Sequence, residues 1–142
     1  MRRAAVILYG TLLLLAATPA ASVEPSVAVI VHPDRRVTLT IDDLASIYLK
    51  RRLFWSDGQP IIALNRESGS AVREHFSRRV FGSNSAHLAA YWNEHYFQGI
   101  FPPTTLSSTA AVKRYVATER NAIGYIRVDE LDDSVRVVLQ LE

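Results

Sequence analysis

The sequence contains no cysteine among its 142 residues. This absence excludes a disulfide framework, a thiolate metal site, a cysteine nucleophile and a lipid-anchored cysteine. The fold must therefore be stabilised by the packing of its core alone. Histidine is also scarce, and the four histidines show neither an H-E-x-x-H motif nor a tight spacing of metal ligands. We accordingly expect no bound metal and no cofactor.

The first residues of the chain combine a positive charge with an apolar run. Met1-Arg2-Arg3 precedes an apolar run from Ala4 to Ala17, and small residues follow from Thr18 to Ser22. This order is typical of a secretory signal peptide, and the run is short for a membrane span. We therefore predict a signal peptide at residues 1–21 and a single domain at residues 22–142. No second apolar run approaches membrane-spanning length, so we expect a periplasmic location.

Removing the predicted signal peptide also removes Arg2 and Arg3, which leaves 14 basic and 14 acidic residues. The apparent basicity is thus a feature of targeting, and it does not support a nucleic-acid-binding role. The remaining basic groups are local, and the largest is Lys50, Arg51 and Arg52. A solvated surface is one interpretation of this group. The other is that these three residues flank a cleft and steer anions toward it.

Short apolar runs alternate with amphipathic segments along the rest of the chain. The runs at 27–31, 61–64 and 122–126 predict buried strands, and the alternating segment 134–141 predicts an edge strand. Helices are expected after four capping positions: Thr40, Ser70, Asn84 or Ser85, and Ser107 or Ser108. This alternation predicts an α/β domain with three α/β/α layers and a mostly parallel sheet.

Aromatic side chains are concentrated between residues 88 and 101. Those at helical spacing are expected to be buried in the core or against a second lobe: Leu88, Tyr91, Trp92 and Tyr96. Exposed members of this segment would instead form a surface for a partner, and the candidates are Tyr96, Phe97, Ile100 and Phe101.

The segment with the clearest chemistry runs from the strand at 61–64 through a polar loop to a helix that begins at Ser70. The start of such a helix presents free backbone N–H groups and the positive end of the helix dipole. Ser70 adds a hydroxyl group, and Arg66 adds a planar set of donors suited to carboxylate, phosphate or sulfate. This combination predicts an oxyanion site. The alternative is that Ser70 is only an N-cap and Arg66 a solvated loop residue.

A catalytic role for Ser70 is not expected. The surrounding residues, Glu67 to Ala71, do not form the G-x-S-x-G nucleophile elbow. His75 is five residues further along the same helix and faces a different direction from a productive general base. We therefore predict a protein without enzyme activity.

Several segments, taken in order, resemble one lobe of the phosphate-binding proteins of ABC transporters. These segments are Asp43–Leu49, then Trp55 and Gly58, then Arg66–Ser70, and finally Ala122–Ile126. The family is part of the type 2 periplasmic binding protein superfamily. Its members have a helix ending in "YLG", a Trp, an Arg-x-x-Gly-Ser-Gly-Thr loop that holds phosphate, and a "GAIGY" strand. The match covers most of residues 27–139, and it is still closer to short, single-lobe exported proteins named phosphate-transport substrate-binding-like.

The resemblance implies an anion site at Arg66, Gly69, Ser70 and Ala71. Arg66 matches the family's phosphate-binding arginine, and Gly69-Ser70 matches the Gly-Ser of its loop. Ala71 and Val72 stand where the family has Gly and Thr, so one hydroxyl ligand is missing.

Two further positions differ from the family pattern. Lys50 stands at the Gly of "YLG", and Asn121 stands at the first Gly of "GAIGY". Asn tolerates the left-handed conformation better than most residues, so we expect Asn121 to end the preceding helix in that conformation.

A complete member of that family has two lobes that close on the ligand, and it needs roughly twice this length. One lobe supplies half a cleft, in which a bound anion stays hydrated and weakly held. The leading hypothesis is a periplasmic protein that binds a phosphate-like oxyanion for uptake or sensing. The alternative is an interaction module that docks to a membrane transporter, receptor or sensor kinase and has a vestigial anion site. A homodimer with two facing half-clefts is a third hypothesis.

Overall fold

The computed structural model describes residues 23–142, so the predicted signal peptide at 1–21 lies outside the described residues. Five strands form one sheet: β1 (Val27–Val31), β2 (Ile62–Arg66), β3 (Thr104–Leu106), β4 (Ala122–Arg127) and β5 (Arg136–Leu141). Four α-helices accompany them: α1 (Ile41–Tyr48), α2 (Ala71–Phe81), α3 (Ala89–Tyr96) and α4 (Thr109–Thr118). Two short 3₁₀ helices are η1 (Ser85–Leu88) and η2 (Val128–Glu130). Within residues 23–142, no helix has the length and apolarity that a membrane crossing requires.

The strands lie in the order β3-β2-β4-β1-β5. β2 is parallel to β3 and to β4, whereas β1 is antiparallel to both β4 and β5. The predicted edge position of the last strand is confirmed, but the sheet is mixed rather than mostly parallel. All five residues of β1 are fully buried. A strand buried on both faces is a continuous apolar run whichever direction its neighbours take, so its sequence does not specify the pairing direction.

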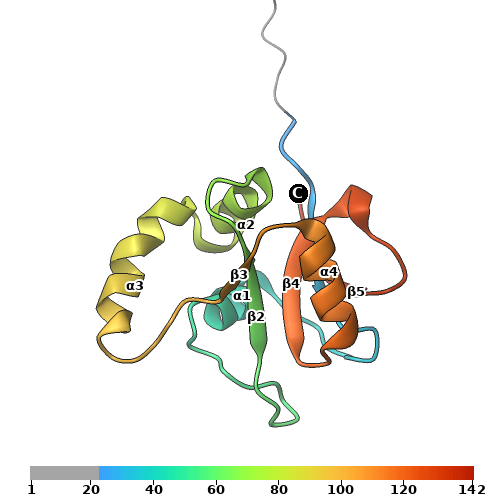
Figure 1. The fold of residues 1–142 in the computed structure, drawn as a ribbon, viewed down its shortest axis with the longest axis horizontal. Helices are drawn as coiled ribbons and strands as arrows, with labels where there is room; N and C mark the ends of the chain where they lie inside the picture. Colours follow the sequence, from blue (N-terminus) through green and yellow to red (C-terminus); the bar gives the residue numbers. More distant parts are fainter. Residues whose placement is uncertain (1–22) are drawn as a thin grey trace, which may run out of the picture.

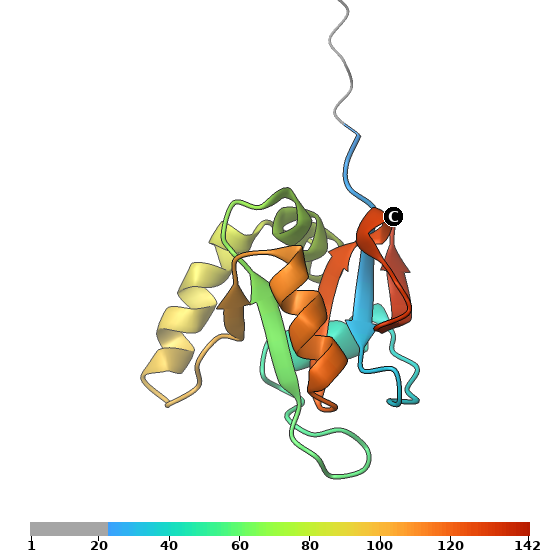
Figure 2. The same cartoon turned by 45° about the vertical axis from the view of Figure 1, so that its right-hand side comes forward.

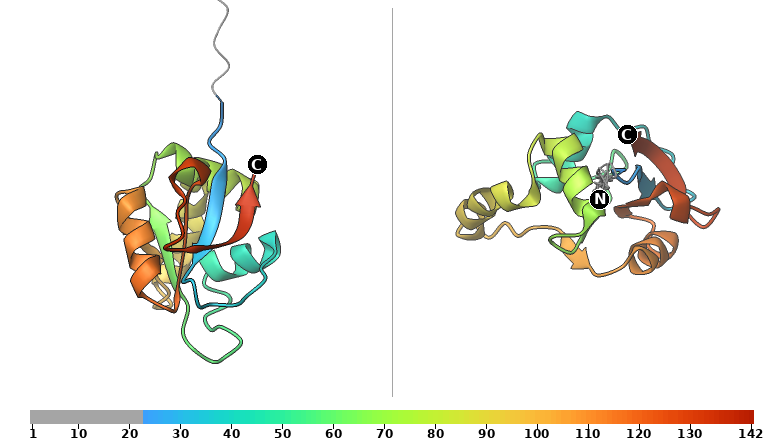
Figure 3. Two further views of the ribbon diagram at one scale, coloured as in Figure 1. Left: turned by 90° about the vertical axis from the view of Figure 1, so that its right-hand side faces the viewer. Right: turned by 90° about the horizontal axis from the view of Figure 1, so that it is seen from above.

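Alternate residues of the central strands contribute to two apolar layers. On one face, Val29 and Tyr125 pack with α1 and α2; on the other, Ile30 and Ile126 pack with α4. Figures 2 and 3 show the same arrangement, with α4 on one side of the sheet and α1 and α2 on the other. The expected three-layer α/β/α architecture is therefore present.

Three aromatic rings fill the layer beneath α1 and α2. Phe76 stacks on Tyr125 with ring centroids 3.9 Å apart, and Tyr48 meets the edge of Phe76 at 4.7 Å. The Tyr48 hydroxyl donates a hydrogen bond to the Leu64 carbonyl at 3.0 Å, so its polar end is satisfied inside the core. Burial raises the pKa of the Tyr48 hydroxyl well above its usual range.

The predicted helix starts are confirmed at Thr40, Ser70 and Ser108, whose side chains each accept a backbone N–H of the first turn. Asn84 caps the 3₁₀ helix η1, which leads into α3, and α3 itself has no side-chain cap. The prediction that Asn121 ends the preceding helix in a left-handed conformation is wrong, because its φ is not positive. Its carbonyl accepts from the Trp55 indole at 3.0 Å and its side chain from Arg35 at 2.8 Å, which hold it in place at the entry to β4. Lys50 is the one non-glycine residue between 23 and 142 with a positive φ, 59°.

The helix α3 does not join the core. None of its side chains is buried, and Figure 1 shows α3 lying apart from the sheet. The expected core burial of the residues at helical spacing is therefore wrong: Tyr91 and Trp92 are half-buried, and Tyr96 is exposed. The three-residue strand β3 that follows was not predicted, because two of its residues are exposed threonines next to two prolines.

Gly124 is required by the packing of α4 on β4. A Cβ atom at this position would lie 2.6 Å from Cγ1 of Val112 and 3.4 Å from Cγ2 of Val116. We predict that Gly124→Ala lowers the free energy of unfolding by about 1–3 kcal/mol, since the branched valine cannot move without shifting the helix. Urea unfolding measures this change. The double variant Gly124→Ala/Val112→Ala should recover part of the loss, and an equally unstable double variant would contradict the packing explanation.

The start of α1 has a capping box that depends on an ionised carboxylate. Asp43 accepts from the backbone N–H of Thr40 at 2.8 Å, and Arg52 lies 3.2 Å from its other oxygen. The Thr40 hydrogen bonds are the main cause that lowers the pKa of Asp43.

We predict that Asp43→Ala costs about 1 kcal/mol of unfolding free energy at pH 7. A lowered folded-state pKa stabilises the protein above the ordinary pKa, and this contribution disappears as the pH falls through the folded-state value. The difference between wild type and variant, measured by urea unfolding, should therefore shrink below about pH 4. A difference that stays constant down to pH 2 would contradict this assignment.

Candidate functional site

The carboxyl ends of β2 and β3 lie at one edge of the sheet, because the two strands are parallel. The helices α2 and α4 begin shortly after these ends, at Ala71 and Thr109. Figure 1 shows both helix starts at the upper end of the sheet. Their N–H groups and positive dipole ends therefore lie at the edge where α/β sheets commonly bind ligands. We call this the Arg66 edge, after the basic residue at its centre.

Arg66 is the last residue of β2 and is only 8% exposed. Its Nη1 donates to the Thr109 hydroxyl at 2.8 Å, so its guanidinium reaches the first residue of α4. Its Nε and Nη2 donate to the two carboxylate oxygens of Glu67 at 2.9 and 3.0 Å. The interpretation of Arg66 as a merely solvated loop residue does not fit its burial.

Glu67 is the local counterion of Arg66. The paired guanidinium lowers the pKa of this carboxyl group, so Glu67 is ionised at neutral pH. Arg73 adds a second positive charge, and its Nη1 donates to the Arg66 carbonyl at 2.9 Å. An incoming anion would thus compete with Glu67 for the donors of Arg66.

The loop from Gly69 to Ala71 forms the start of α2. Gly69 has φ +84°, and no atom lies within 4 Å of where its Cβ would be, so glycine is needed there for conformation rather than for space. The Ser70 hydroxyl accepts from the Arg73 N–H at 3.2 Å as the N-cap. The Ser70 hydroxyl donates its own proton to no residue between 23 and 142, so this proton is available to a ligand.

Sequence reasoning missed two residues at this edge. Thr109 is the first residue of α4, and its only signal in the sequence was the helix start predicted after Ser107 or Ser108. Tyr125 lies beneath the site: its hydroxyl accepts from the Arg66 N–H at 3.1 Å and donates to the Asn65 side chain. Burial is the main cause that raises the pKa of Tyr125, so it remains a neutral donor and acceptor.

The predicted steering residues lie elsewhere. Lys50, Arg51 and Arg52 precede the loop that enters β2, so they lie at the amino end of the strands, opposite to the Arg66 edge. Arg52 pairs with Asp43 at 3.2 Å, and Arg51 stands over the Tyr91 ring at 5.9 Å. Their proposed contribution at the mouth of the anion site is therefore not supported by their position.

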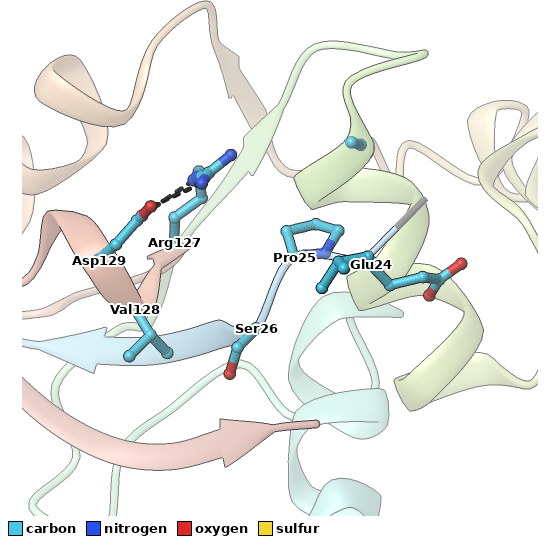
Figure 4. A pocket seen from close by; sticks show the side chains of 8 residues that line it. Glu24, Pro25, Ser26, Arg127, Val128 and Asp129 are labelled. Carbon is cyan, nitrogen blue, oxygen red and sulfur yellow. Dashed lines mark hydrogen bonds and ion pairs between the residues drawn. The ribbon is translucent and has the colours of Figure 1, made fainter. Parts of the chain in front are cut away.

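A pocket of about 480 Å³ adjoins the Arg66 edge at Ala71 (Figure 4). Its other walls are residues 23–26 and the segment from Arg127 to Asp129. Arg127 pairs with Asp129 at 2.6 Å, so the pocket has no unpaired basic group to attract an anion.

The segment 23–26 is attached to α2. The carboxylate of Glu24 lies 2.8 Å from the His75 ring and 2.6 Å from Arg78. These contacts lower the pKa of Glu24, with the Arg78 hydrogen bond as the first cause. The other ring nitrogen of His75 lies 3.2 Å from the Leu141 carbonyl. Both ring nitrogens are thus engaged away from Ser70. Among residues 23–142, no three acidic or histidine side chains are grouped as metal ligands.

Comparison with known proteins assigns the chain to a family. A family model described as a PBP superfamily domain matches residues 25–138. The chain belongs to this family. No curated protein matches the chain.

Solved structures of similar proteins have the same fold. One is a candidate phosphate ABC transporter substrate-binding protein from Clostridium perfringens with bound phosphate, at 28% identity and a TM-score of 0.65. Another is an ABC-type phosphate transport receptor from Vibrio cholerae, at 23% identity and a TM-score of 0.65. The match covers 80% of this chain in both cases, but 44% and 45% of the two relatives. The chain thus spans less than half the length of these relatives.

We predict that Tyr125→Phe destabilises the protein by about 1–3 kcal/mol, because the Arg66 N–H loses one of its two acceptors, the other being Asn65 Oδ1 at 3.2 Å, and Asn65 loses the donor that the hydroxyl supplies. The ring stacking on Phe76 is retained in this variant, so the loss reports the hydroxyl alone. Urea unfolding is the measurement. Unchanged stability would contradict this, and would mean that the existing Asn65 acceptor, or water, satisfies the Arg66 N–H without the tyrosine hydroxyl.

Proposed function

We propose that this protein is a periplasmic solute-binding protein that holds a small, phosphate-like oxyanion at the Arg66 edge. It would serve uptake or sensing and would not catalyse a reaction. The observation that supports this most directly is the contact of Arg66 with the first turns of two helices: its side chain donates to Thr109 of α4, and its carbonyl accepts from Arg73 of α2. The phosphate bound to the Clostridium perfringens relative supports the same class of ligand. The signal-like sequence at residues 1–21 supports export.

The chemistry of binding follows from the donors that converge at this edge. Arg66 supplies a planar, permanently charged fork, and Ser70 and Thr109 supply hydroxyl groups at the positive ends of α2 and α4. Glu67 occupies two donors of this fork, so binding requires its carboxylate to swing away or to share the guanidinium. The site is open on one side, so affinity is expected to depend on ionic strength.

Several features favour binding over catalysis. His75, the histidine on the Ser70 helix, is bonded to Glu24 and to the Leu141 carbonyl, so it is not available as a general base for Ser70. Relatives of known structure are described as a substrate-binding protein and a transport receptor.

A second candidate function is docking to a membrane transporter or sensor, with or without a bound anion. The observation that favours it is the exposure of aromatic side chains next to α3: Tyr96, Phe97 and Phe101. A homodimer with facing Arg66 edges remains a third proposal, in which the second copy would complete the site.

Calorimetric titration with phosphate and with sulfate tests the anion site. We expect heat of binding for wild type, and at least a tenfold loss of affinity in Arg66→Lys, which keeps the charge but removes the fork. Ser70→Ala should also weaken binding by removing a hydroxyl donor. Thr40→Ala is the matched control, because it removes an equivalent N-cap from α1, far from the site. No heat of binding with wild type would refute the proposal. Heat in both the Arg66 and the Ser70 variants equal to that of wild type would refute it as well.

The ion pair between Arg66 and Glu67 leads to a separate prediction. Glu67→Gln keeps the size of the side chain but removes the charge that competes with the anion. We expect this variant to bind phosphate roughly three to ten times more tightly at neutral pH, measured by the same titration. Weaker binding would show instead that Glu67 contributes to holding the ligand.

A further inference from the structure

A second surface lies at the opposite end of the sheet from the Arg66 edge. The loops that enter β2 and β3 meet there and enclose a groove of about 320 Å³. We call it the amino-end groove, and its lining residues are Lys50, Leu53, Gly99, Ile100, Phe101 and Pro102.

The walls of this groove are apolar and open to solvent. Leu53 is 50% exposed and Phe101 is 57% exposed. Tyr96 lies against Phe101 with ring centroids 5.4 Å apart, and the neighbouring Phe97 is 89% exposed. The apolar area thus continues beyond the groove to the end of α3. A contiguous patch of this kind is typical of a contact surface for another macromolecule.

The rim of the groove has a positive charge without a counterion. Neither Lys50 nor Arg51 forms a salt bridge with any residue from 23 to 142, and no acidic residue lines the groove. Partial burial lowers the pKa of Lys50, so its ammonium group has lost water without gaining a carboxylate. A partner that supplies a carboxylate at this point would compensate for that loss.

The groove is held in shape before any partner binds. Lys50 has a left-handed backbone, with its N–H donating to the Ile47 carbonyl at 3.1 Å. The Tyr91 hydroxyl of α3 donates to the Leu49 carbonyl at 2.7 Å, which ties α3 to the end of α1. Pro102-Pro103 restricts the other wall. A rigid surface of this kind loses little conformational entropy when it binds.

We infer that the amino-end groove is a docking site for a protein partner that inserts a large apolar side chain next to a carboxylate. The concave shape suits a protruding side chain better than a flat lipid surface, and the rim charge selects an acidic neighbour. Because the groove and the Arg66 edge lie at opposite ends of the strands, docking does not need a bound anion.

The experiment selects a random displayed peptide library on the purified protein and then titrates the synthetic consensus peptide. We expect enrichment of peptides with a Leu, Ile or aromatic residue close to Asp or Glu. Phe101→Ala and Lys50→Gln should each weaken the consensus peptide roughly tenfold, and replacing its acidic residues by amides should cancel the effect of Lys50→Gln. Tyr115→Ala and Arg79→Gln are matched controls on other exposed surfaces and should bind normally.

The remaining outcomes distinguish a protein partner from other occupants of the groove, and they distinguish failure of this inference from failure of the proposed anion site. No enrichment, or a peptide whose binding survives both groove variants, overturns the inference. Binding to phosphatidylglycerol vesicles that is lost in Phe101→Ala would assign the surface to lipid instead. A dimer in sedimentation velocity that Phe101→Ala dissociates would assign it to a second copy. Peptide binding that persists in Arg66→Lys supports the inference whether or not the anion site exists.

Discussion

The geometry of the Arg66 edge depends on one buried arginine, through both its backbone and its guanidinium group. Arg66 is anchored from below by the Tyr125 hydroxyl on β4, and its side chain reaches Thr109 at the start of α4. Its carbonyl accepts from Arg73 on α2. A single residue thus links two strands and two helices at the carboxyl end of the sheet. The buried charge itself is balanced by Glu67, and the backbone and side-chain contacts of Arg66 together bring the starts of two helices to the same edge.

Much of this arrangement could be predicted from local sequence signals. Capping residues such as Thr40 and Ser70 act through their own backbone neighbours, so their roles are visible without the fold. Continuous apolar runs predicted the central strands, and their alternation with helices predicted the α/β layers. The chain belongs to the PBP superfamily domain family, which agrees with the resemblance seen in the ordered segments around Arg66 and Tyr125.

Other features depend on contacts between distant segments, and the sequence alone did not predict them. The pairing of β1 with β4 and β5 is antiparallel, although an apolar run contains no information on direction. Thr109 joins Arg66 across 43 residues of chain. The helical spacing in α3 predicted burial in the core, but Tyr91 and Trp92 are only half-buried, and Tyr96 forms an exposed surface with Phe97 and Phe101. Lys50 belongs to that surface, at the far end of the strands from the Arg66 edge.

A crystal structure determined with phosphate in the crystallisation solution tests the central claim most directly. The account predicts a tetrahedral ligand between the starts of α2 and α4, within hydrogen-bond distance of Arg66, Ser70 and Thr109, with the Glu67 carboxylate rotated away. An empty edge at saturating phosphate, with Glu67 still paired to both donors of Arg66, would contradict it.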